Sequence, residues 1–408
     1  MIVKSVWVRQ TGPCGAPCRA RRDVERSRVK LYQEAAHRSR PPHRGAPVTG
    51  VGTAFGTFGE LLQGVLPEEG GDFLVTLPVA RWTMATFRRG SPSGELEVRP
   101  RHKTKALRLA RMIAESAPAG PSAHPPGGVL TVSSVIPEGK GLASSSADLV
   151  ATARAVGRAL GVPMPPTRIE RLLARIEPTD GVLYPAIVAY HHRSVRLHSV
   201  LGSLPAMAVV GIDEGGSVDT VDFNRIPKPF TTADRHAYAG LLERLTVAVR
   251  GHDLAEVGRI ATRSARMNQA LRHKASLEPM LDICREVGGL GVAVGHSGTT
   301  SGILLDATDP AYTRRVTAAA EACGELTGGG PGDGPGGVSV YRTLSFGTVP
   351  SPHALPGQHA LAARPLVPGR PAAAARSALP APRALPVTHP LPEPSAFPVP
   401  PGADEEVP

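Results

Sequence analysis

The residues best suited to chemistry run from Pro137 to Ala147 and read Pro-Glu-Gly-Lys-Gly-Leu-Ala-Ser-Ser-Ser-Ala. Glycines at 139 and 141 let the backbone approach an anion closely, and three successive serines supply hydroxyl and amide donors. Branched apolar residues predict a strand over 129–136, and apolar residues at helical spacing predict a helix over 144–160. This order places free N–H groups and the positive end of a helix dipole against a phosphate. The stretch therefore predicts a phosphate-binding loop.

The loop differs from the two commonest phosphate-binding motifs. Lys140 is followed by glycine, so the common P-loop ending in Gly-Lys-Ser/Thr is absent. The residue three positions beyond Gly141 is Ser144, so the dinucleotide fingerprint is absent as well. A serine-rich turn that only caps a helix is the alternative interpretation.

The two ends of the 408-residue chain differ in composition from its middle. Residues 1–44 carry 11 Lys/Arg against 3 Asp/Glu, and residues 346–408 hold 16 of the 42 prolines with four arginines and four acids. The middle therefore contributes only +3 to the formal net charge of +11. We expect a disordered basic arm over 1–46 and a disordered Pro/Ala-rich tail over 346–408. The arm lacks interleaved aromatic residues, so its charge does not predict a nucleic-acid partner.

The cysteines and the hydropathy pattern point to a reduced compartment without a membrane. Cys14 and Cys18 have no partner pair at metal-binding spacing, whereas Cys284 and Cys323 fall in helical patterns and are expected in the core. No apolar run of about 18 residues exists, and the arginine-rich start lacks an apolar signal region. We expect a cytoplasmic protein.

Strand-like and helix-like segments alternate between the two ends and predict an α+β fold in two lobes, 47–205 and 206–345. The predicted strands are 48–55, 73–79, 82–87, 96–99, 129–136, 206–212, 291–294, 301–305 and 338–341. The predicted helices are 103–116, 144–160, 167–176, 233–250, 254–269, 277–287 and 310–323. An apolar stretch at 182–189 is not assigned a type.

The predicted loop resembles the second motif of the GHMP kinases, Pro-x-x-x-Gly-Leu-Gly-Ser-Ser-Ala-Ala. The matching residues are Pro137, Gly141, Leu142, Ser144, Ser145 and Ala147. The chain departs from the motif at Ala143, where the family has glycine, and at Ser146, where it has alanine.

Two further motifs of that family have counterparts in the expected order. Near the start, Gly56-Thr-Phe-Gly-Glu-Leu-Leu-Gln-Gly64 corresponds to a motif that contacts the small-molecule substrate. Near the end, Gly291-Val-Ala-Val-Gly-His-Ser-Gly-Thr-Thr-Ser-Gly302 corresponds to a loop that supports the phosphate cradle. The resemblance covers about residues 50–345. It implies an S5-like N-terminal lobe and a ferredoxin-like C-terminal lobe, with the active site between them.

The segment Ile176-Glu-Pro-Thr-Asp-Gly181 places two carboxylates near the end of a helix, because Pro178 prevents the helix from continuing. Phosphoryl transfer needs a metal and a group that accepts the proton of the attacking alcohol. The resemblance implies that Ser145 and Glu177 hold Mg²⁺ and that Asp180 is the catalytic base. Glu170 is the second candidate for the metal. A solvent-exposed cap and turn pair is the alternative.

The resemblance also implies ATP as cofactor and assigns further residues to the site. The predicted ATP-binding residues are Pro137, Gly139, Lys140, Gly141, Leu142, Ala143, Ser144, Ser145, Ser146, Gly295, Ser297 and Gly298. The predicted substrate-binding residues are Glu60, Gln63 and Thr179. Lys140 is open to two interpretations, because its side chain could touch a phosphate or point to solvent.

Glu60 narrows the substrate class. Mevalonate-type members have a lysine in this motif, which lowers the pKa of the base, whereas an acid there would raise the pKa of Asp180. A carboxylate could instead pair with a substrate ammonium group, which favours an amino acid. With Glu-Pro-Thr-Asp and Gly-His-Ser-Gly-Thr, this motif resembles the L-threonine kinase branch, and so does the loop at 215–224. That branch makes O-phospho-L-threonine for adenosylcobalamin.

Other interpretations stay open from the sequence. Another alcohol, for example homoserine, would keep the chemistry, and a non-catalytic nucleotide-binding regulator is kept open by Ala143 and Ser146. His296 with Ser297 is interpreted as loop packing rather than a nucleophile pair. Adjacent His191 and His192 point apart, so we expect surface histidines rather than a shared metal. A homodimer is left open.

Overall fold

The computed structural model describes residues 48–91, 94–117, 125–216, 228–296, 298–332 and 336–346. These residues belong to one unit of the chain, and the second unit, His359–Pro408, lies outside them. The predicted arm, nearly all of the predicted tail, Cys14, Cys18 and most of the 215–224 loop also lie outside the described residues.

The described residues form alternating strands and helices. The strands are β1 (Thr49–Val65), β2 (Asp72–Arg89), β3 (Leu96–Arg99), β4 (Gly128–Ser134), β5 (Ile187–His191), β6 (Arg196–Gly202), β7 (Met207–Asp213), β8 (Gly291–Val294), β9 (Thr300–Asp306) and β10 (Val338–Arg342). The helices are α2 (Thr104–Glu115), α3 (Ser144–Leu160), α4 (Pro166–Leu173), α6 (Thr232–Gly251), α7 (Leu254–Asn268), α8 (Leu277–Glu286) and α9 (Tyr312–Thr327).

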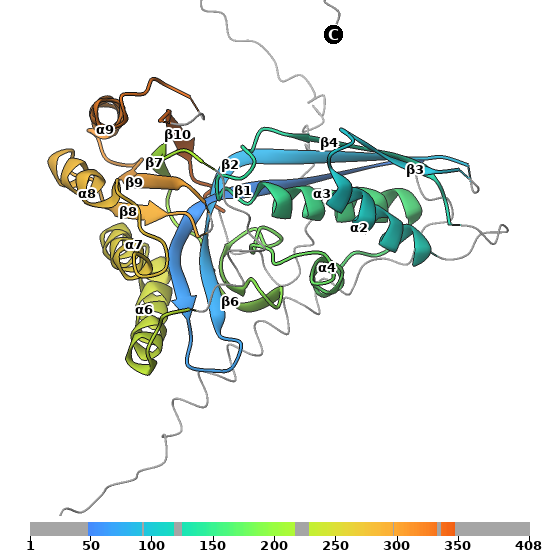
Figure 1. The fold of residues 1–408 in the computed structure, drawn as a ribbon, viewed down its shortest axis with the longest axis horizontal. Helices are drawn as coiled ribbons and strands as arrows, with labels where there is room; N and C mark the ends of the chain where they lie inside the picture. Colours follow the sequence, from blue (N-terminus) through green and yellow to red (C-terminus); the bar gives the residue numbers. More distant parts are fainter. Residues whose placement is uncertain are drawn as a thin grey trace, which may run out of the picture. The chain divides into compact units, whose positions relative to one another are not determined.

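One sheet connects the two predicted lobes. Its strand order is β10-β7-β9-β8-β1-β2-β4-β3, and the β5–β6 hairpin is attached to β2. The connection between the halves is the antiparallel pairing of β1 with β8, in which Glu60 lies opposite Val294. Helices α2 and α3 lie along β1 to β4. Helices α8 and α9 lie along the strands of the second half, α7 contacts β8 and β1, and α6 packs beside α7 against β1 and β6 (Figure 1). This arrangement confirms the predicted α+β class.

Helix α3 packs unusually closely on β1, and this contact fixes the helix that follows the predicted phosphate loop. A Cβ atom at Gly52 would lie only 2.2 Å from the carbonyl oxygen of Ala151, so only glycine permits this approach. Nearly every residue of α3 is buried, which its alanine-rich sequence allows. The helix ends at Gly161, whose φ of 66° forms a left-handed cap.

The structure differs from the prediction mainly in the length and number of the strands. β1 continues well beyond its predicted end at residue 55, so the motif at 56–64 lies inside a strand, and β2 joins the two predicted strands 73–79 and 82–87 into one. From Ala54 onward almost every residue of β1 is buried, which removes the alternation that identifies a strand in a sequence. The β5–β6 hairpin was not predicted as strands.

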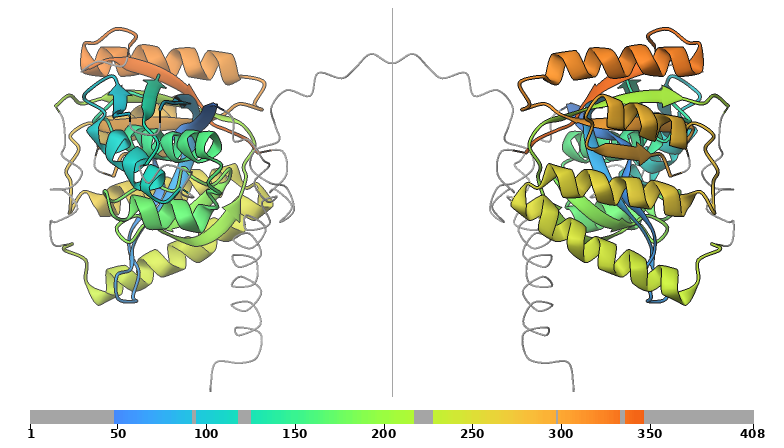
Figure 2. Two further views of the ribbon diagram at one scale, coloured as in Figure 1. Left: turned by 90° about the vertical axis from the view of Figure 1, so that its right-hand side faces the viewer. Right: turned by 90° about the vertical axis from the view of Figure 1, so that its left-hand side faces the viewer.

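The second half has its own small hydrophobic core beneath α8 and α9. Figure 2 shows these helices from two sides. Cys284 and Cys323 lie in this core as free thiols, which confirms their predicted role. Among the described residues, no helix is long and apolar enough to cross a membrane.

Candidate active site

A cavity of about 340 Å³ lies where the predicted phosphate loop, the Glu177–Asp180 segment and β1 meet. Seven of the predicted ATP-binding residues line it, together with both predicted metal ligands and the predicted base. The seven are Gly139, Gly141, Leu142, Ala143, Ser144, Ser145 and Ser146. Residues far apart in the sequence are therefore brought together at one hollow in the protein.

The first turn of α3 presents its backbone amides to this cavity. Ser144, Ser145 and Ser146 form the turn and line the wall, and no side chain of the described residues caps the helix. Uncapped N–H groups and the positive end of the helix dipole are a ready site for an anion. The loop geometry therefore suits a phosphate group.

Ala143, the residue before the helix, adopts a left-handed conformation with φ 60° and ψ 31°. This conformation costs a residue with a Cβ atom about 1 kcal/mol relative to glycine. The glycine of the family motif is thus explained by the backbone, and the alanine here is tolerated with local strain. Its methyl group is buried in the core.

Replacing Ala143 with glycine should relieve this strain. We expect the free energy of unfolding to rise by up to about 1 kcal/mol, reduced by the methyl group lost from the core. Denaturant melts of the two proteins measure the difference. Loss of stability in Ala143→Gly would show that the methyl contact outweighs the backbone strain.

Asp180 lies directly against the start of α3 because Ser146 holds it. The Ser146 hydroxyl accepts a hydrogen bond from the Asp180 backbone N–H (3.0 Å) and contacts the carboxylate Oδ2 (3.3 Å). The pKa of Asp180 is raised to about 6, because burial and the nearby Glu177 charge outweigh the lowering effect of the Ser146 hydrogen bond. A carboxyl group with a pKa near neutrality suits a general base. Ser146, a departure from the family motif, is thus a partner of the predicted base.

Replacing Ser146 with alanine should raise the pKa of Asp180, because a hydrogen bond to the carboxylate is lost. We expect the acidic limb of the pH–rate profile to move to higher pH, with kcat at neutral pH lowered roughly tenfold and KM for ATP unchanged. The profile separates this effect from simple destabilisation. An unshifted acidic limb would show that Ser146 has no influence on the base.

Glu177 and Ser145 are in contact, as the predicted metal site requires. The Ser145 hydroxyl donates to one carboxylate oxygen of Glu177, and the other oxygen is paired with the ammonium group of Lys105. A hydroxyl and a carboxylate are the hard oxygen donors that Mg²⁺ prefers, and the Lys105 contact shows that this carboxylate attracts a cation. The donor set therefore fits Mg²⁺.

Glu170, the second metal candidate, lies away from the cavity. Its buried carboxylate accepts hydrogen bonds from the Tyr184 hydroxyl (2.8 Å) and the Leu197 backbone N–H (2.9 Å). It holds α4 to β6 and is not among the residues that line the cavity. The geometry favours Glu177 for the metal.

The predicted substrate residues lie at the inner end of the cavity. Glu60 and Thr179 line it, and Gln63 lies behind Glu60, with Nε2 3.5 Å from Glu60 Oε2 and Oε1 2.7 Å from His296 Nδ1. The Thr179 hydroxyl is buried and forms no hydrogen bond among the described residues. Burial, and then the Asp180 charge, raise the pKa of Glu60 well above its usual range. An additional cation next to Glu60 would therefore favour the charged form of its carboxyl group.

Two histidines that were not predicted to belong to the site line the same region. The rings of His192 and His296 are 4.7 Å apart, and burial lowers the pKa of His296 well below its usual value. The prediction of surface histidines at 191 and 192 was wrong, because both side chains are buried. The two do point apart, since His192 lines the cavity and His191 does not.

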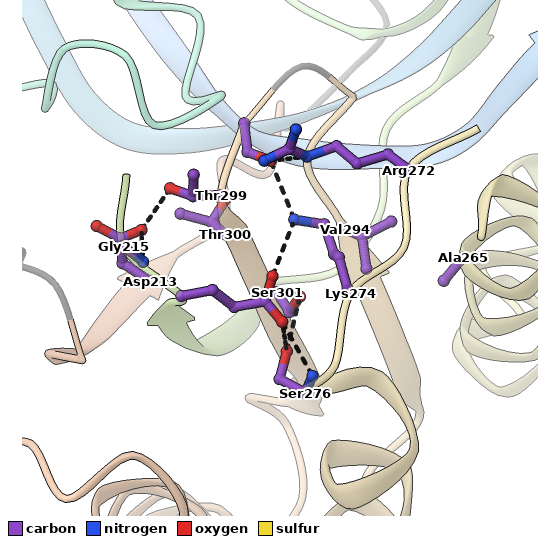
Figure 3. A network of polar contacts seen from close by, with 12 residues as sticks. Asp213, Gly215, Ala265, Arg272, Lys274, Ser276, Val294, Thr299, Thr300 and Ser301 are labelled. Atoms are coloured by element: carbon purple, nitrogen blue, oxygen red, sulfur yellow. Dashed lines mark hydrogen bonds and ion pairs between the residues drawn. The ribbon is translucent and has the colours of Figure 1, made fainter. Parts of the chain in front are cut away.

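The loop between β8 and β9 packs against the phosphate loop as predicted for the third motif. A Cβ atom at Gly298 would lie 2.1 Å from the Lys140 carbonyl oxygen, so the two backbones are in direct contact. Arg272 Nε and Lys274 Nζ both donate to the Gly298 carbonyl, at 3.2 and 3.0 Å (Figure 3). Burial lowers the pKa of Lys274 to about 8. Ser297 lies outside the described residues.

The remaining predicted ATP-binding residues support the loop rather than line the cavity. These are Pro137, Lys140, Gly295 and Gly298. The ammonium group of Lys140 is paired with Asp213 Oδ2 at 2.5 Å, so its side chain does not simply point to solvent, and its contact with a phosphate stays a prediction. Its carbonyl accepts a hydrogen bond from Thr300 Oγ1 (3.1 Å), which adds a second link between the two loops.

A basic cluster at the start of α2 also lines the cavity and was missed in the sequence. It consists of His102, Lys103 and Lys105. Lys103 is anchored by ion pairs of 2.5 Å to Glu138 and Asp148, while the Lys105 side chain is half exposed. Basic residues near the start of a helix are common, so the sequence offers no reason to select these three. Their position in the cavity wall makes them candidates for contact with a polyphosphate.

Comparison with known proteins agrees with the family resemblance of the sequence motifs. The GHMP kinases N-terminal domain matches residues 104–187, and the GHMP kinases C-terminal domain matches residues 243–332. An L-threonine kinase of Citrobacter freundii is 28% identical over 249 residues, or 61% of this chain and 83% of that protein. An L-threonine kinase of Salmonella typhimurium is 28% identical over 179 residues, and the match spans 43% of this chain and 59% of that protein.

Solved structures of the same fold have lower sequence identity. A homoserine kinase from Cytophaga hutchinsonii superimposes with a TM-score of 0.55 at 16% identity, covering 75% of this chain and 98% of that one. A Lactococcus lactis galactokinase superimposes with a TM-score of 0.55 at 11% identity, covering 81% and 98%. With both domains matched in order and the α+β fold shared with these solved structures, this chain carries the N-terminal and C-terminal domains of the GHMP kinases, a family of ATP-dependent phosphotransferases.

Proposed function

We propose that this kinase phosphorylates the hydroxyl of L-threonine and so produces O-phospho-L-threonine. The observation that carries the proposal is the position of Glu60 in the same cavity as Asp180. An acid beside the predicted base suits an acceptor that carries an ammonium group near its hydroxyl. The 28% identity to two L-threonine kinases supports the same substrate. The product would then serve adenosylcobalamin synthesis, as the sequence resemblance to that branch implies.

In the proposed reaction, the protein mainly positions groups and neutralises charge. The amides at the start of α3 and the loop glycines hold the phosphates, and Lys105 lies at the same wall. Asp180 accepts the proton of the acceptor hydroxyl at a carboxylate oxygen, while Ser146 keeps that carboxylate in place. Ser145 and Glu177 would hold Mg²⁺, which when bound neutralises charge on the transferred phosphoryl group.

Glu60 and Thr179 are the proposed contacts to the amino acid. An ammonium group would remove the electrostatic cost of charging the buried Glu60 carboxyl, and this coupling favours an ammonium ligand over a neutral one. The Thr179 hydroxyl is buried without a hydrogen-bond partner among the described residues, so a polar group of the substrate can satisfy it.

The test is ADP release from ATP–Mg²⁺ with a panel of alcohols: L-threonine, L-serine, L-homoserine and mevalonate. Turnover with L-threonine alone, with O-phosphothreonine identified by ³¹P NMR, is the expected result. Turnover with a different alcohol would keep the kinase chemistry and reject the threonine assignment. ATP binding without turnover of any alcohol would favour a nucleotide-binding regulator.

Replacing Glu60 with glutamine tests the ammonium contact separately. We expect KM for L-threonine to rise roughly 10- to 100-fold with KM for ATP unchanged, because one charge-assisted hydrogen bond is lost. The matched acceptor is 3-hydroxybutyrate, which keeps the hydroxyl and carboxylate but lacks the ammonium group. Wild type should discriminate strongly between the two acceptors. An equal preference in wild type and Glu60→Gln would reject the contact.

A further inference from the structure

Two histidines and a glutamate converge at a second place, away from the active-site cavity. His191 is the last residue of β5, His198 lies on the neighbouring strand β6, and Glu68 lies in the turn between β1 and β2. One ligand atom from each side chain lies within 4.8 Å of the other two. The next residue, His192, lines the active-site cavity and His191 does not, so the two side chains point apart.

The geometry of the two imidazoles suits a tetrahedral metal ion. His191 Nε2 and His198 Nδ1 are 3.3 Å apart, and the rings are perpendicular, with an interplanar angle of 90°. Two nitrogens bound to tetrahedral zinc, each about 2.0–2.1 Å from the ion, are separated by about 3.3–3.4 Å. The nitrogens therefore already have the separation that zinc requires, so a metal would replace the hydrogen between them with little movement.

A backbone carbonyl fixes the tautomer of His191. The Asp72 carbonyl lies 3.2 Å from His191 Nδ1, and because a carbonyl only accepts, Nδ1 must carry the hydrogen. The lone pair is then on Nε2, which faces His198. Metal-binding histidines are commonly held by a carbonyl or carboxylate on their other nitrogen in this way. His191 itself is buried, so its ring is fixed by packing as well.

We propose that Glu68, His191 and His198 form a binding site for a divalent transition metal ion, with zinc favoured. Two imidazoles and a carboxylate are common zinc ligands, and a fourth position remains for water. The hard Mg²⁺ ion prefers oxygen ligands, so the two metal sites of the protein would be chemically distinct. A bound ion would tie the β1–β2 turn to the β5–β6 hairpin. Arg196, opposite His191 in the hairpin, lowers the affinity by its positive charge.

The test is metal binding to the chelator-treated full-length protein with Mg²⁺ in excess. Co²⁺ is added as a visible probe and Zn²⁺ is titrated in competition with a chromophoric chelator. We expect one equivalent of Co²⁺ to give the visible absorption of a tetrahedral site, and Zn²⁺ to displace it. Zinc at 100 times its dissociation constant should raise the melting temperature by roughly 5 °C.

Two variants assign the site. His198→Ala should lose the cobalt absorption and bind zinc roughly 100-fold more weakly, while its kinase activity with ATP–Mg²⁺ stays at the wild-type level. Glu177→Gln, which alters the proposed Mg²⁺ site, should keep the absorption. If His198→Ala melts like an unfolded protein, the exposed Glu68→Gln provides the same comparison. Wild type without stoichiometric binding, or variants of Glu68 and His198 that bind like wild type, would overturn the proposal.

Discussion

Replacing Asp180 with asparagine should abolish turnover and at the same time make the protein more stable. Without a base to accept the hydroxyl proton, kcat should fall by roughly 10²- to 10⁴-fold, while KM for ATP changes little. The asparagine side chain has the same shape as the aspartate and still lies next to Ser146. The two effects have opposite signs, so they distinguish a catalytic role from simple misfolding.

The gain in stability follows from the pKa of about 6, compared with 3.8 for the free side chain. The folded protein binds this proton more tightly than the unfolded chain, so charging Asp180 destabilises the fold above pH 6. The cost disappears as the pH falls from 6 through 3.8. We expect Asp180→Asn to raise the free energy of unfolding at pH 7 by about 1–3 kcal/mol, with the lower end favoured because Asp180 is partly exposed in the cavity.

The measurement is a set of denaturant melts at several pH values beside steady-state kinetics. Wild type and Asp180→Asn should differ most above pH 6 and converge near pH 4. Wild-type kcat/KM should fall tenfold per pH unit below about pH 6. Asp282→Asn, at an exposed position in α8, is the matched control and should change stability by less than about 0.5 kcal/mol. An Asp180→Asn protein with wild-type kcat would refute the assignment of the base.

Replacing Gly298 with alanine should damage both stability and nucleotide binding. The new Cβ atom would lie 2.1 Å from the Lys140 carbonyl oxygen and 2.4 Å from Gly141 Cα, and both are backbone atoms of the phosphate loop. The loop must therefore move. We expect a loss of about 2–4 kcal/mol in the free energy of unfolding and a rise of at least roughly tenfold in KM for ATP.

A glycine in open space is the control for this substitution. Gly240, in the exposed part of α6, has no atom within 4 Å of an added Cβ, so Gly240→Ala should stabilise the protein by about 0.5–1 kcal/mol. KM for ATP should be unchanged in this variant. Wild-type melting and wild-type KM in Gly298→Ala would mean that the two loops do not depend on each other.

The sequence predicted the proposed metal-binding and base residues, but it did not predict several other residues that line the cavity. Ser145, Glu177 and Asp180 were predicted from residue types, a proline and a family motif, and the structure places all three at one cavity. Their roles stay predictions until the variants are measured. His192, Lys103 and Lys105 carry no local signal, because only the folding of β5 and α2 brings them to the same wall.

The fold class followed from the alternation of segments, but the extent of the sheet did not. A strand buried on both faces has no polar alternation, so the long course of β1 past Phe55 could not be recognised. Lys140 shows the same limit at the level of a side chain. Its partner Asp213 lies on a strand of the other predicted lobe, and no pattern near residue 140 indicates that contact.

The pairing of β1 with β8 has a consequence for how the chain folds during synthesis. Gln63 and His296 are in contact across 233 residues of sequence, so the ribosome must produce most of the protein before this side of β1 is covered. Until then the nascent chain exposes an unpaired strand edge, a known source of aggregation. Contacts of such long range also slow folding. The part of the active-site cavity next to Gln63 is therefore completed late in folding. In a host that synthesises the chain quickly, the yield of folded protein should depend on chaperones more than on the stability of the folded protein.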